Sequence, residues 1–259
     1  EIEHPIVREA LRLFGIDFPI EITTFADIPG QTGLGSSSAF AVGLVHALHA
    51  LKGEMVSKNT IAATAANIEV DILGRSMGKQ DHYASAYGNL NTFTFNKNGT
   101  VNVEPVLYQP EVRSLIEKNL NLFYLKSKRN ASKILEIQEQ NTPQIFNNLT
   151  KLKGFVDPLR EIFSSGLDIN KFGEMLHQSW LIKKGLTDVI SSTEIDTYYQ
   201  KALDNGALGG KLLGAGGGGF LLIYVEEQKQ QAVVAALSNL FHLNVRFDKS
   251  GTRITYYDN

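Results

Sequence analysis

The sequence predicts an α+β fold with two closely joined lobes. Helical and strand-like segments follow one another in mixed order along the 259 residues, which favours this class over a helical bundle or a barrel. The length suits one large or two small domains. Because the chain has no long linker, repeat or low-complexity stretch, we expect the lobes to adjoin, the first over residues 1–110 and the second over residues 111–259.

Hydrophobic periodicity and turn residues predict the individual elements. The first lobe should contain, in order, a helix over 6–14, a strand over 20–25, a loop over 27–38, helices over 39–51 and 57–73, a loop over 75–81, and strands over 90–95 and 101–106. The second should contain a helix over 111–118, a strand over 120–125, helices over 131–147, 171–184 and 194–205, a strand over 220–225, a helix over 227–240 and a strand over 253–257.

Composition and charge exclude several classes of protein. Hydrophobic residues make up 43% and charged residues 20% of the chain, which excludes wholesale disorder. A net charge of −2 does not support broad electrostatic binding to nucleic acid. Without cysteine there is no disulfide, thiolate metal site or cysteine nucleophile. No apolar run approaches the ~18 residues that span a bilayer, and no signal-peptide pattern is visible, so we expect a cytoplasmic protein with no membrane partner.

A glycine- and serine-rich loop at residues 29–38 is the first candidate site. Glycines at 30, 33 and 35 let the backbone approach an anion, and the helix that follows presents free N–H groups and a positive dipole end. Ser36–Ser38 add hydroxyls that bind phosphate or ligate magnesium. The loop lacks the Gly-Lys-Ser/Thr ending of a P-loop. By spacing alone, a phosphate cradle and a serine-capped helix are about equally supported.

A second glycine-rich segment covers residues 206–219, where eight of the 23 glycines lie. It contains a Gly-x-Gly-x-x-Gly match at 214, 216 and 219. A dinucleotide-binding fingerprint follows a strand and opens a helix, whereas this match leads into a predicted strand. We therefore interpret the segment as a place of close backbone approach between the lobes. A simple glycine-rich bend is the alternative.

Two acidic residues between these segments are candidates for chemistry. Glu69 lies near the end of a predicted helix, and Asp81 lies twelve residues later in a predicted loop, beside Lys79. A helix carboxylate and a serine hydroxyl could complete a magnesium site on nucleotide phosphates. A loop aspartate could accept the proton of an attacking hydroxyl, and the neighbouring lysine would keep that aspartate ionised. Taken singly, each residue is more often a solvated surface charge.

Together, these residues resemble the GHMP kinase superfamily of small-molecule kinases. Its second motif, Pro-x-x-x-Gly-Leu-Gly-Ser-Ser-Ala/Ser, matches residues 29–39, and its C-terminal glycine-rich motif matches residues 211–220. The resemblance implies a two-lobed fold with a ribosomal S5-like N-terminal lobe and a ferredoxin-like C-terminal lobe. The chain is most similar to bacterial D-glycero-D-manno-heptose 7-phosphate kinases, through residues 3–10, 33–40, 78–84, 177–184 and 209–220.

The resemblance implies ATP and Mg²⁺ as cofactors, a sugar phosphate as substrate and phosphorylation of its anomeric hydroxyl. A homodimer is one option for assembly, although the sequence does not indicate the oligomeric state. Asp81 and Lys79 would be catalytic, and Ser36, Ser37 and Glu69 would hold the metal. The nucleotide would contact Pro29, Gly33, Leu34, Gly35, Ser36, Ser37, Ser38, Gly216 and Gly217. The substrate would contact Lys79, Gln80, Arg129, Lys183 and Lys184.

One motif of the family has no counterpart here. The superfamily normally begins with about 70 further residues, which include a first, sugar-binding motif; this chain begins beyond it, and without a starting methionine. A fragment, a natural truncation and a non-catalytic binding protein are therefore alternatives to a complete kinase. Other acceptors of the same fold, namely fucose, galactose and mevalonate, also stay open. A dinucleotide-dependent oxidoreductase would rest only on the match at 214–219.

Overall fold

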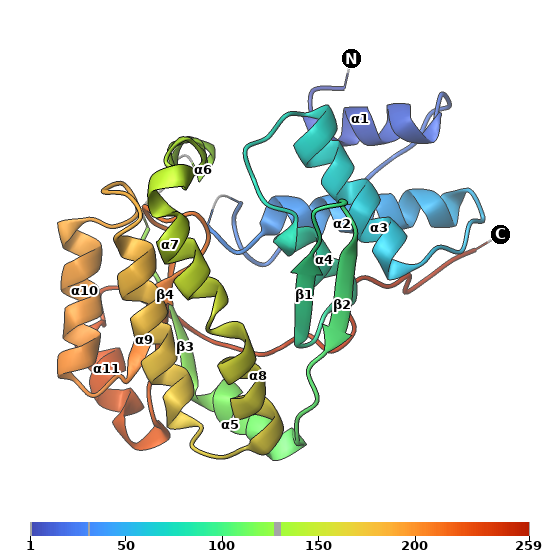
Figure 1. The fold of residues 1–259 in the computed structure, drawn as a ribbon. Coiled ribbons are helices and arrows are strands. Elements are labelled where there is room, and N and C mark those ends of the chain that lie inside the picture. Colours follow the sequence, from blue (N-terminus) through green and yellow to red (C-terminus); the bar gives the residue numbers. More distant parts are fainter. Residues whose placement is uncertain (1, 31, 127–130, 259) are drawn as a thin grey trace. The chain divides into compact units, whose positions relative to one another are not determined.

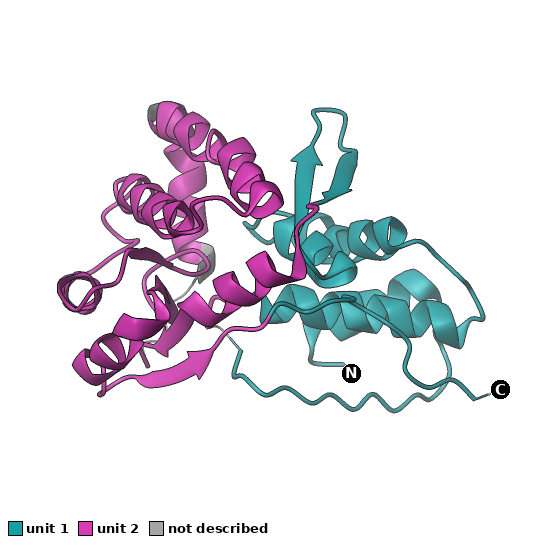
Figure 2. Cartoon of the chain, turned by 90° about the horizontal axis from the view of Figure 1, so that it is seen from below, with its two compact units in different colours: residues 1–30, 35–105, 247–259 teal, residues 31–34, 106–246 magenta. Residues whose placement is uncertain are grey.

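The computed structural model describes residues 2–30, 32–126 and 131–258 (Figure 1). These form two compact units (Figure 2). Unit 1 comprises residues 1–30, 35–105 and 247–259, and unit 2 comprises residues 31–34 and 106–246. This division differs from the expected lobes in three places, because residues 31–34 and 106–110 cluster with unit 2 and the C-terminal residues 247–259 cluster with unit 1.

Unit 1 is mainly helical and carries one small antiparallel sheet. Its elements are α1 (Pro5–Phe14), α2 (Ser36–Leu51), α3 (Lys58–Ala66), the π-helix η1 (Asn67–Ile72), α4 (Gln80–Tyr87), β1 (Asn91–Phe95) and β2 (Val101–Pro105). The expected loop over 75–81 therefore ends sooner, and a helix that was not predicted begins at residue 80. Strand β1 pairs with β2 in a hairpin.

Local capping explains where the first helices begin and end. The His4 side chain accepts from the Val7 amide, and Gly15 ends α1 in the left-handed conformation with φ 65°. The Ser57 side chain accepts from the Thr60 amide at the start of α3. Apolar faces of α1 to α4 then form one buried cluster, in which Val45 and Ala65 are fully enclosed. This core holds the N-terminus of α2, η1 and α4 in one unit.

Two predicted strands are wrong. Residues 20–25 and 253–257 carry strand-like alternation, but neither segment forms a strand. Among the described residues neither segment pairs with a sheet. Phe25 is 94% exposed and Tyr256 is 79% exposed, so their apolar side chains are not covered in this chain. A strand-like pattern needs a neighbouring strand to accept its backbone hydrogen bonds, and the described chain supplies none.

Unit 2 is a four-stranded antiparallel sheet with helices packed against it. Its elements are α5 (Pro110–Asn119), β3 (Leu120–Tyr124), α6 (Ala131–Gln140), α7 (Thr142–Lys153), α8 (Val156–Ser165), α9 (Asn170–Lys184), α10 (Thr193–Asp204), β4 (Gly209–Leu212), β5 (Phe220–Tyr224), the 3-10 helix η2 (Glu227–Lys229), α11 (Gln230–Ala236) and β6 (Phe241–Asn244). The strand order is β4-β5-β3-β6. The sheet core includes Phe123, Trp180 and Leu221.

Several elements of unit 2 differ from the sequence expectation. The helix expected over 131–147 is divided between α6 and α7 at Asn141, with Pro143 in the first turn of α7, where a proline is tolerated. Helix α8 and strands β4 and β6 were not predicted. Strand β4 lies inside the glycine-rich segment, and a Cβ on Gly209 would lie 2.0 Å from the Gly173 carbonyl oxygen of α9. The glycine is needed there for helix and sheet to approach closely.

Among the described residues, no helix is both long and apolar enough to cross a membrane.

Candidate active site

The glycine- and serine-rich loop leads directly into α2. Gly35 is the N-terminal cap residue, with a left-handed φ of 68°, and its carbonyl accepts from the Ala39 amide. Ser36–Ser38 form the first turn of the helix. The Ser38 hydroxyl is buried and has no hydrogen-bond partner among the described residues. A helix start with free amides and a buried, unpaired hydroxyl is suited to an anion or a hydrated cation.

Glu69 is fully buried in the π-helix η1. Its Oε2 accepts from His82 Nε2 at 2.9 Å, its Oε1 contacts Arg75, and its carboxylate also accepts from the Ser37 hydroxyl. Burial works to raise the pKa of Glu69, but hydrogen bonds from His82 and Ser37 and the charge of Arg75 outweigh it and hold the pKa below its usual value. Glu69 is therefore an ionised carboxylate joined to the start of α2.

Asp81 lies in the first turn of α4, and not in a loop as the sequence suggested. The side chain is half-buried and lies against the loop before α2, because a Cβ on Gly35 would be 3.0 Å from Asp81 Oδ2. Burial raises the pKa of Asp81; the charge of His82 opposes this rise and that of Glu69 adds to it. Unit 1 thus brings together Gly35, Ser37, Glu69 and Asp81.

The expected influence of Lys79 on Asp81 is wrong. Lys79 Nζ lies 3.7 Å from Asp71 Oδ2, so its ammonium group pairs with a different carboxylate. The pKa of Asp81 is raised by burial, whereas a neighbouring lysine would have lowered it. Gln80 opens α4 with an exposed side chain. Any contact of these two residues with substrate is left as a prediction.

The two glycine-rich segments meet within unit 2. A Cβ on Gly33 would lie 2.8 Å from the Leu213 carbonyl oxygen, and a Cβ on Gly219 would lie 2.1 Å from that of Thr32. The Gly217 amide donates to the Ile190 carbonyl at 2.8 Å. The part of the second segment between β4 and β5, residues 213–219, is therefore a turn whose glycines permit close approach to the first segment. Its Gly-x-Gly-x-x-Gly match leads into β5 and not into a helix.

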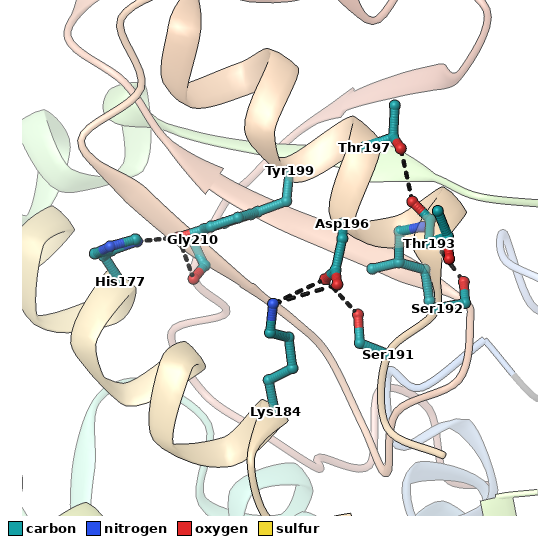
Figure 3. A network of polar contacts seen from close by, with 10 residues as sticks. His177, Lys184, Ser191, Ser192, Thr193, Asp196, Thr197, Tyr199 and Gly210 are labelled. Carbon is teal, nitrogen blue, oxygen red and sulfur yellow. Dashed lines mark hydrogen bonds and ion pairs between the residues drawn. The ribbon is translucent and has the colours of Figure 1, made fainter. Parts of the chain in front are cut away.

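Two of the expected substrate contacts lie at the C-terminal end of α9. Lys183 Nζ donates to the carbonyls of Leu212, at 3.4 Å, and Gly214, beside the glycine-rich turn. Burial and the charge of Lys211 lower the pKa of Lys183 to about 7. Lys184 Nζ lies 3.2 Å from Asp196 Oδ1, which also accepts from Ser191 (Figure 3). Arg129, a further candidate, lies outside the described residues.

Family models match both halves of the chain. The family model described as "GHMP kinases N terminal domain" matches residues 5–89, and that described as "GHMP kinases C terminal" matches residues 159–243. The chain belongs to the GHMP kinase family. The helix start at Ser36, with Glu69 and Asp81, falls in the N-terminal match, and the glycine-rich turn at 214–219 falls in the C-terminal match.

Individual GHMP kinases are similar over most of the chain. A D-glycero-α-D-manno-heptose 7-phosphate kinase of Campylobacter jejuni is 30% identical over 195 residues, which are 74% of this chain and 57% of the relative. A mevalonate kinase of Pyrococcus horikoshii is 29% identical over 76% of this chain and 57% of the relative. The chain therefore spans a little over half the length of these two relatives.

Solved structures share the GHMP kinase fold. A D-glycero-D-manno-heptose 1-phosphate kinase from Bacteroides thetaiotaomicron aligns with a TM-score of 0.69 and 24% identity, covering 97% of this chain and 74% of the other. A putative sugar kinase from Campylobacter jejuni aligns with a TM-score of 0.70 and 25% identity, covering 96% and 73%. These likenesses confirm the predicted two-part α+β fold.

Two residues that contact Glu69 were not predicted from the sequence. Arg75 follows the π-helix, and His82 follows Asp81 in α4. The helical spacing placed Glu69 at the edge of an apolar stripe, where a charged side chain would remain solvated. The π-helix widens the turn at this point, and such π-turns often occur at functional sites. The one sequence signal for the His82 contact is its position directly after Asp81.

Proposed function

We propose that this GHMP kinase transfers the γ-phosphoryl group of ATP to a hydroxyl of a sugar phosphate, with the anomeric hydroxyl of D-glycero-D-manno-heptose 7-phosphate as the favoured acceptor. The observation that carries the proposal is the gathering of Gly35, Ser37, Glu69 and Asp81 in unit 1. The similarity to the Campylobacter heptose 7-phosphate kinase supports this choice of acceptor.

Nucleotide phosphates would be bound by the backbone at the start of α2. Gly33, Leu34, Gly35 and Ser36 lead into a helix of 16 residues whose first amides have no acceptor within the helix. The hydroxyls of Ser36–Ser38 add donors, and the Ser38 hydroxyl would find in a phosphate oxygen the partner that the described chain does not provide. Pro29, Gly216 and Gly217 are proposed to border the nucleotide through the two glycine-rich segments.

The residues present fit Mg²⁺. Glu69 supplies an ionised carboxylate, and Ser37, which contacts it, supplies a hydroxyl, as does Ser36; both are hard oxygen donors of the kind that Mg²⁺ prefers. Within the described residues, no three His, Asp or Glu side chains are placed to hold a metal alone. A magnesium site here would use one carboxylate, and phosphate oxygens and water would be its remaining ligands. When bound, Mg²⁺ would neutralise charge on the transferring phosphoryl group.

Asp81 is proposed as the base. As the acceptor oxygen forms its bond to the γ-phosphorus and the bond to the leaving ADP oxygen breaks, the hydroxyl proton passes to an Asp81 carboxylate oxygen. The raised pKa of Asp81 suits this role, because it makes the carboxylate a stronger proton acceptor while leaving it able to ionise. Gly35 keeps this carboxylate close to the phosphate-binding backbone.

Substrate phosphate would be recognised by basic residues. Lys183 is the strongest candidate, because its ammonium group lies beside the glycine-rich turn and donates to backbone carbonyls rather than to a carboxylate of the described chain. Lys79 and Lys184 already pair with Asp71 and Asp196 and would have to exchange those partners. Gln80 and Arg129 remain proposed contacts. A homodimer and a cytoplasmic location are also proposals, the latter because ATP and sugar phosphates are available there.

A coupled ADP-release assay tests the proposal. The chain is incubated with ATP and Mg²⁺ and with heptose 7-phosphate, galactose, fucose or mevalonate in parallel, and ligand binding is followed separately by thermal shift. We expect stabilisation by Mg²⁺–ATP and turnover with heptose 7-phosphate. Stabilisation by NAD but not by ATP would overturn the kinase proposal. ATP binding without turnover on any acceptor would favour a non-catalytic binding protein.

A further inference from the structure

Three segments of unit 1 supply donors to the Glu69 carboxylate. Ser37 lies at the start of α2, Arg75 lies after the π-helix, and His82 lies in α4. Two of these donors differ sharply in exposure: the His82 side chain is fully buried, whereas 32% of the Arg75 side chain is exposed. The contact with His82 therefore lies wholly within the core, whereas the contact with Arg75 joins the buried carboxylate to a side chain that reaches the surface.

The contact with Glu69 is the feature that explains a histidine at position 82. A carboxylate only accepts hydrogen bonds, so His82 Nε2 must carry the hydrogen that it shares with Glu69 Oε2. The other ring nitrogen, Nδ1, is buried without a partner among the described residues. Burying a ring nitrogen without a hydrogen bond costs free energy, so an apolar side chain would pack here more favourably if packing were the only role.

We propose that His82 is a positioning residue for the magnesium site. It holds Glu69 Oε2 in place, which would leave Oε1, the oxygen in contact with the partly exposed Arg75, as the one to face Mg²⁺. This inference rests on the proposed function, because it takes Glu69 to be a metal ligand. Hydrogen-bonded partners of ligating carboxylates orient them, and losing such a partner typically weakens metal binding about 10- to 100-fold.

The test compares metal binding in two variants of His82 with a matched control. Leucine at position 82 removes the donor at similar volume, and glutamine retains an N–H donor. His46→Leu serves as the control, because His46 lies in the same unit and also makes one side-chain hydrogen bond, to Thr252 Oγ1 at 3.0 Å. Mn²⁺ replaces Mg²⁺, and its binding in the presence of a non-hydrolysable ATP analogue is followed by electron paramagnetic resonance.

We expect His82→Leu to weaken Mn²⁺ binding at least 10-fold and His82→Gln to remain within about 3-fold of the wild type. Binding of the analogue in EDTA, without metal, should be the same in all variants. Mn²⁺ binding by folded His82→Leu within 2-fold of the wild type would overturn the inference alone. Failure of the wild-type chain to bind the analogue with Mn²⁺ would overturn the proposed function, and the inference with it.

A second pair of variants covers the case in which His82→Leu does not fold. His82→Gln and His82→Asn both retain an amide, but the asparagine side chain is one methylene shorter and holds its donor farther from Glu69. A positioning role predicts tighter Mn²⁺ binding by the glutamine variant than by the asparagine variant. Equal binding by this pair would contradict the role.

Discussion

The carboxylate of Asp81 lies against the backbone of Gly35, so that a Cβ at position 35 would come within 3.0 Å of Asp81 Oδ2. Gly35 also has a φ of 68°, a conformation that residues with a side chain rarely adopt. The contact joins the residue before the helix start to the proposed base, which lies 46 residues later in the chain. A substitution at Gly35 would therefore disturb both the backbone conformation before α2 and the position of the Asp81 carboxylate.

Gly35→Ala should therefore reduce both stability and activity. We expect a loss of about 1–3 kcal/mol in the free energy of unfolding from backbone strain, with an additional displacement of Asp81 that lowers kcat. Gly53→Ala is the matched control, since Gly53 has a similar φ of 70° with no atom within 4 Å of an added Cβ. Chemical denaturation and steady-state kinetics measure the two effects. Equal loss of kcat in both variants would show that the contact with Asp81 is irrelevant.

Asp81→Asn should nearly abolish turnover while leaving nucleotide binding intact. Removing the proton acceptor is expected to lower kcat by about 10²-fold or more, the usual contribution of an acid–base group. Isothermal titration with an ATP analogue should give an affinity close to that of the wild type. The matched control is Asp71→Asn, because Asp71 is exposed and pairs with Lys79. Near-wild-type turnover by Asp81→Asn would remove Asp81 from the catalytic role.

The same substitution should make the protein more stable at neutral pH. The pKa of Asp81 in the folded state is raised, so the folded state holds this proton more tightly than the unfolded state, whose carboxyl titrates near about 3.9. Its ionisation is therefore unfavourable for folding at every pH above the raised pKa. We expect Asp81→Asn to melt at a higher temperature than the wild type at pH 7, and this advantage to shrink as the pH falls toward 4. Calorimetry across this range checks the sign.

Gly219→Ala should disrupt the glycine-rich turn. The added Cβ would lie 2.1 Å from the Thr32 carbonyl oxygen, which belongs to backbone and has little room to move. We expect a loss of several kcal/mol in unfolding free energy or a shift of residues 32–33 that weakens ATP binding. Gly99→Ala has a comparable φ of 85° with open space around an added Cβ, and should cost only the strain. Similar melting temperatures for both variants would argue against close approach of the two segments.

Lys183→Met should change the pH dependence of stability. The pKa of Lys183 is lowered to about 7 by burial and by Lys211, compared with about 10.4 in an unfolded chain. The cost of burying its charge is complete below pH 7 and disappears progressively as the pH rises toward 10. The methionine variant should therefore gain stability relative to the wild type at pH 6 and lose this advantage by pH 9–10. A difference in melting temperature that does not vary with pH would contradict the burial of the charged group.

The local sequence determined much of the site and of the helical framework. Gly35 and Ser36–Ser38 predicted a glycine turn at a helix start, and their place before an apolar run predicted α2. Gly15 predicted the end of α1 and Ser57 the start of α3, because caps act within a few residues of the chain. Glu69 and Asp81 were predicted as site residues because they are acidic and lie between the two glycine-rich segments in the sequence.

Only the tertiary structure decided how these residues act together. The π-helix and the core of unit 1 bury Glu69 beside His82. This contact depends on how the helices of unit 1 pack together, and hydrophobic periodicity does not indicate it. The strand-like segment 20–25 has no strand partner in the described chain, and β4 forms within a glycine run because β5 pairs with it. The electrostatics of the site also depended on the fold. Lys79 lies two residues before Asp81 in the sequence, yet its ammonium group pairs with Asp71. Burial, and not a neighbouring charge, sets the direction of the Asp81 pKa shift.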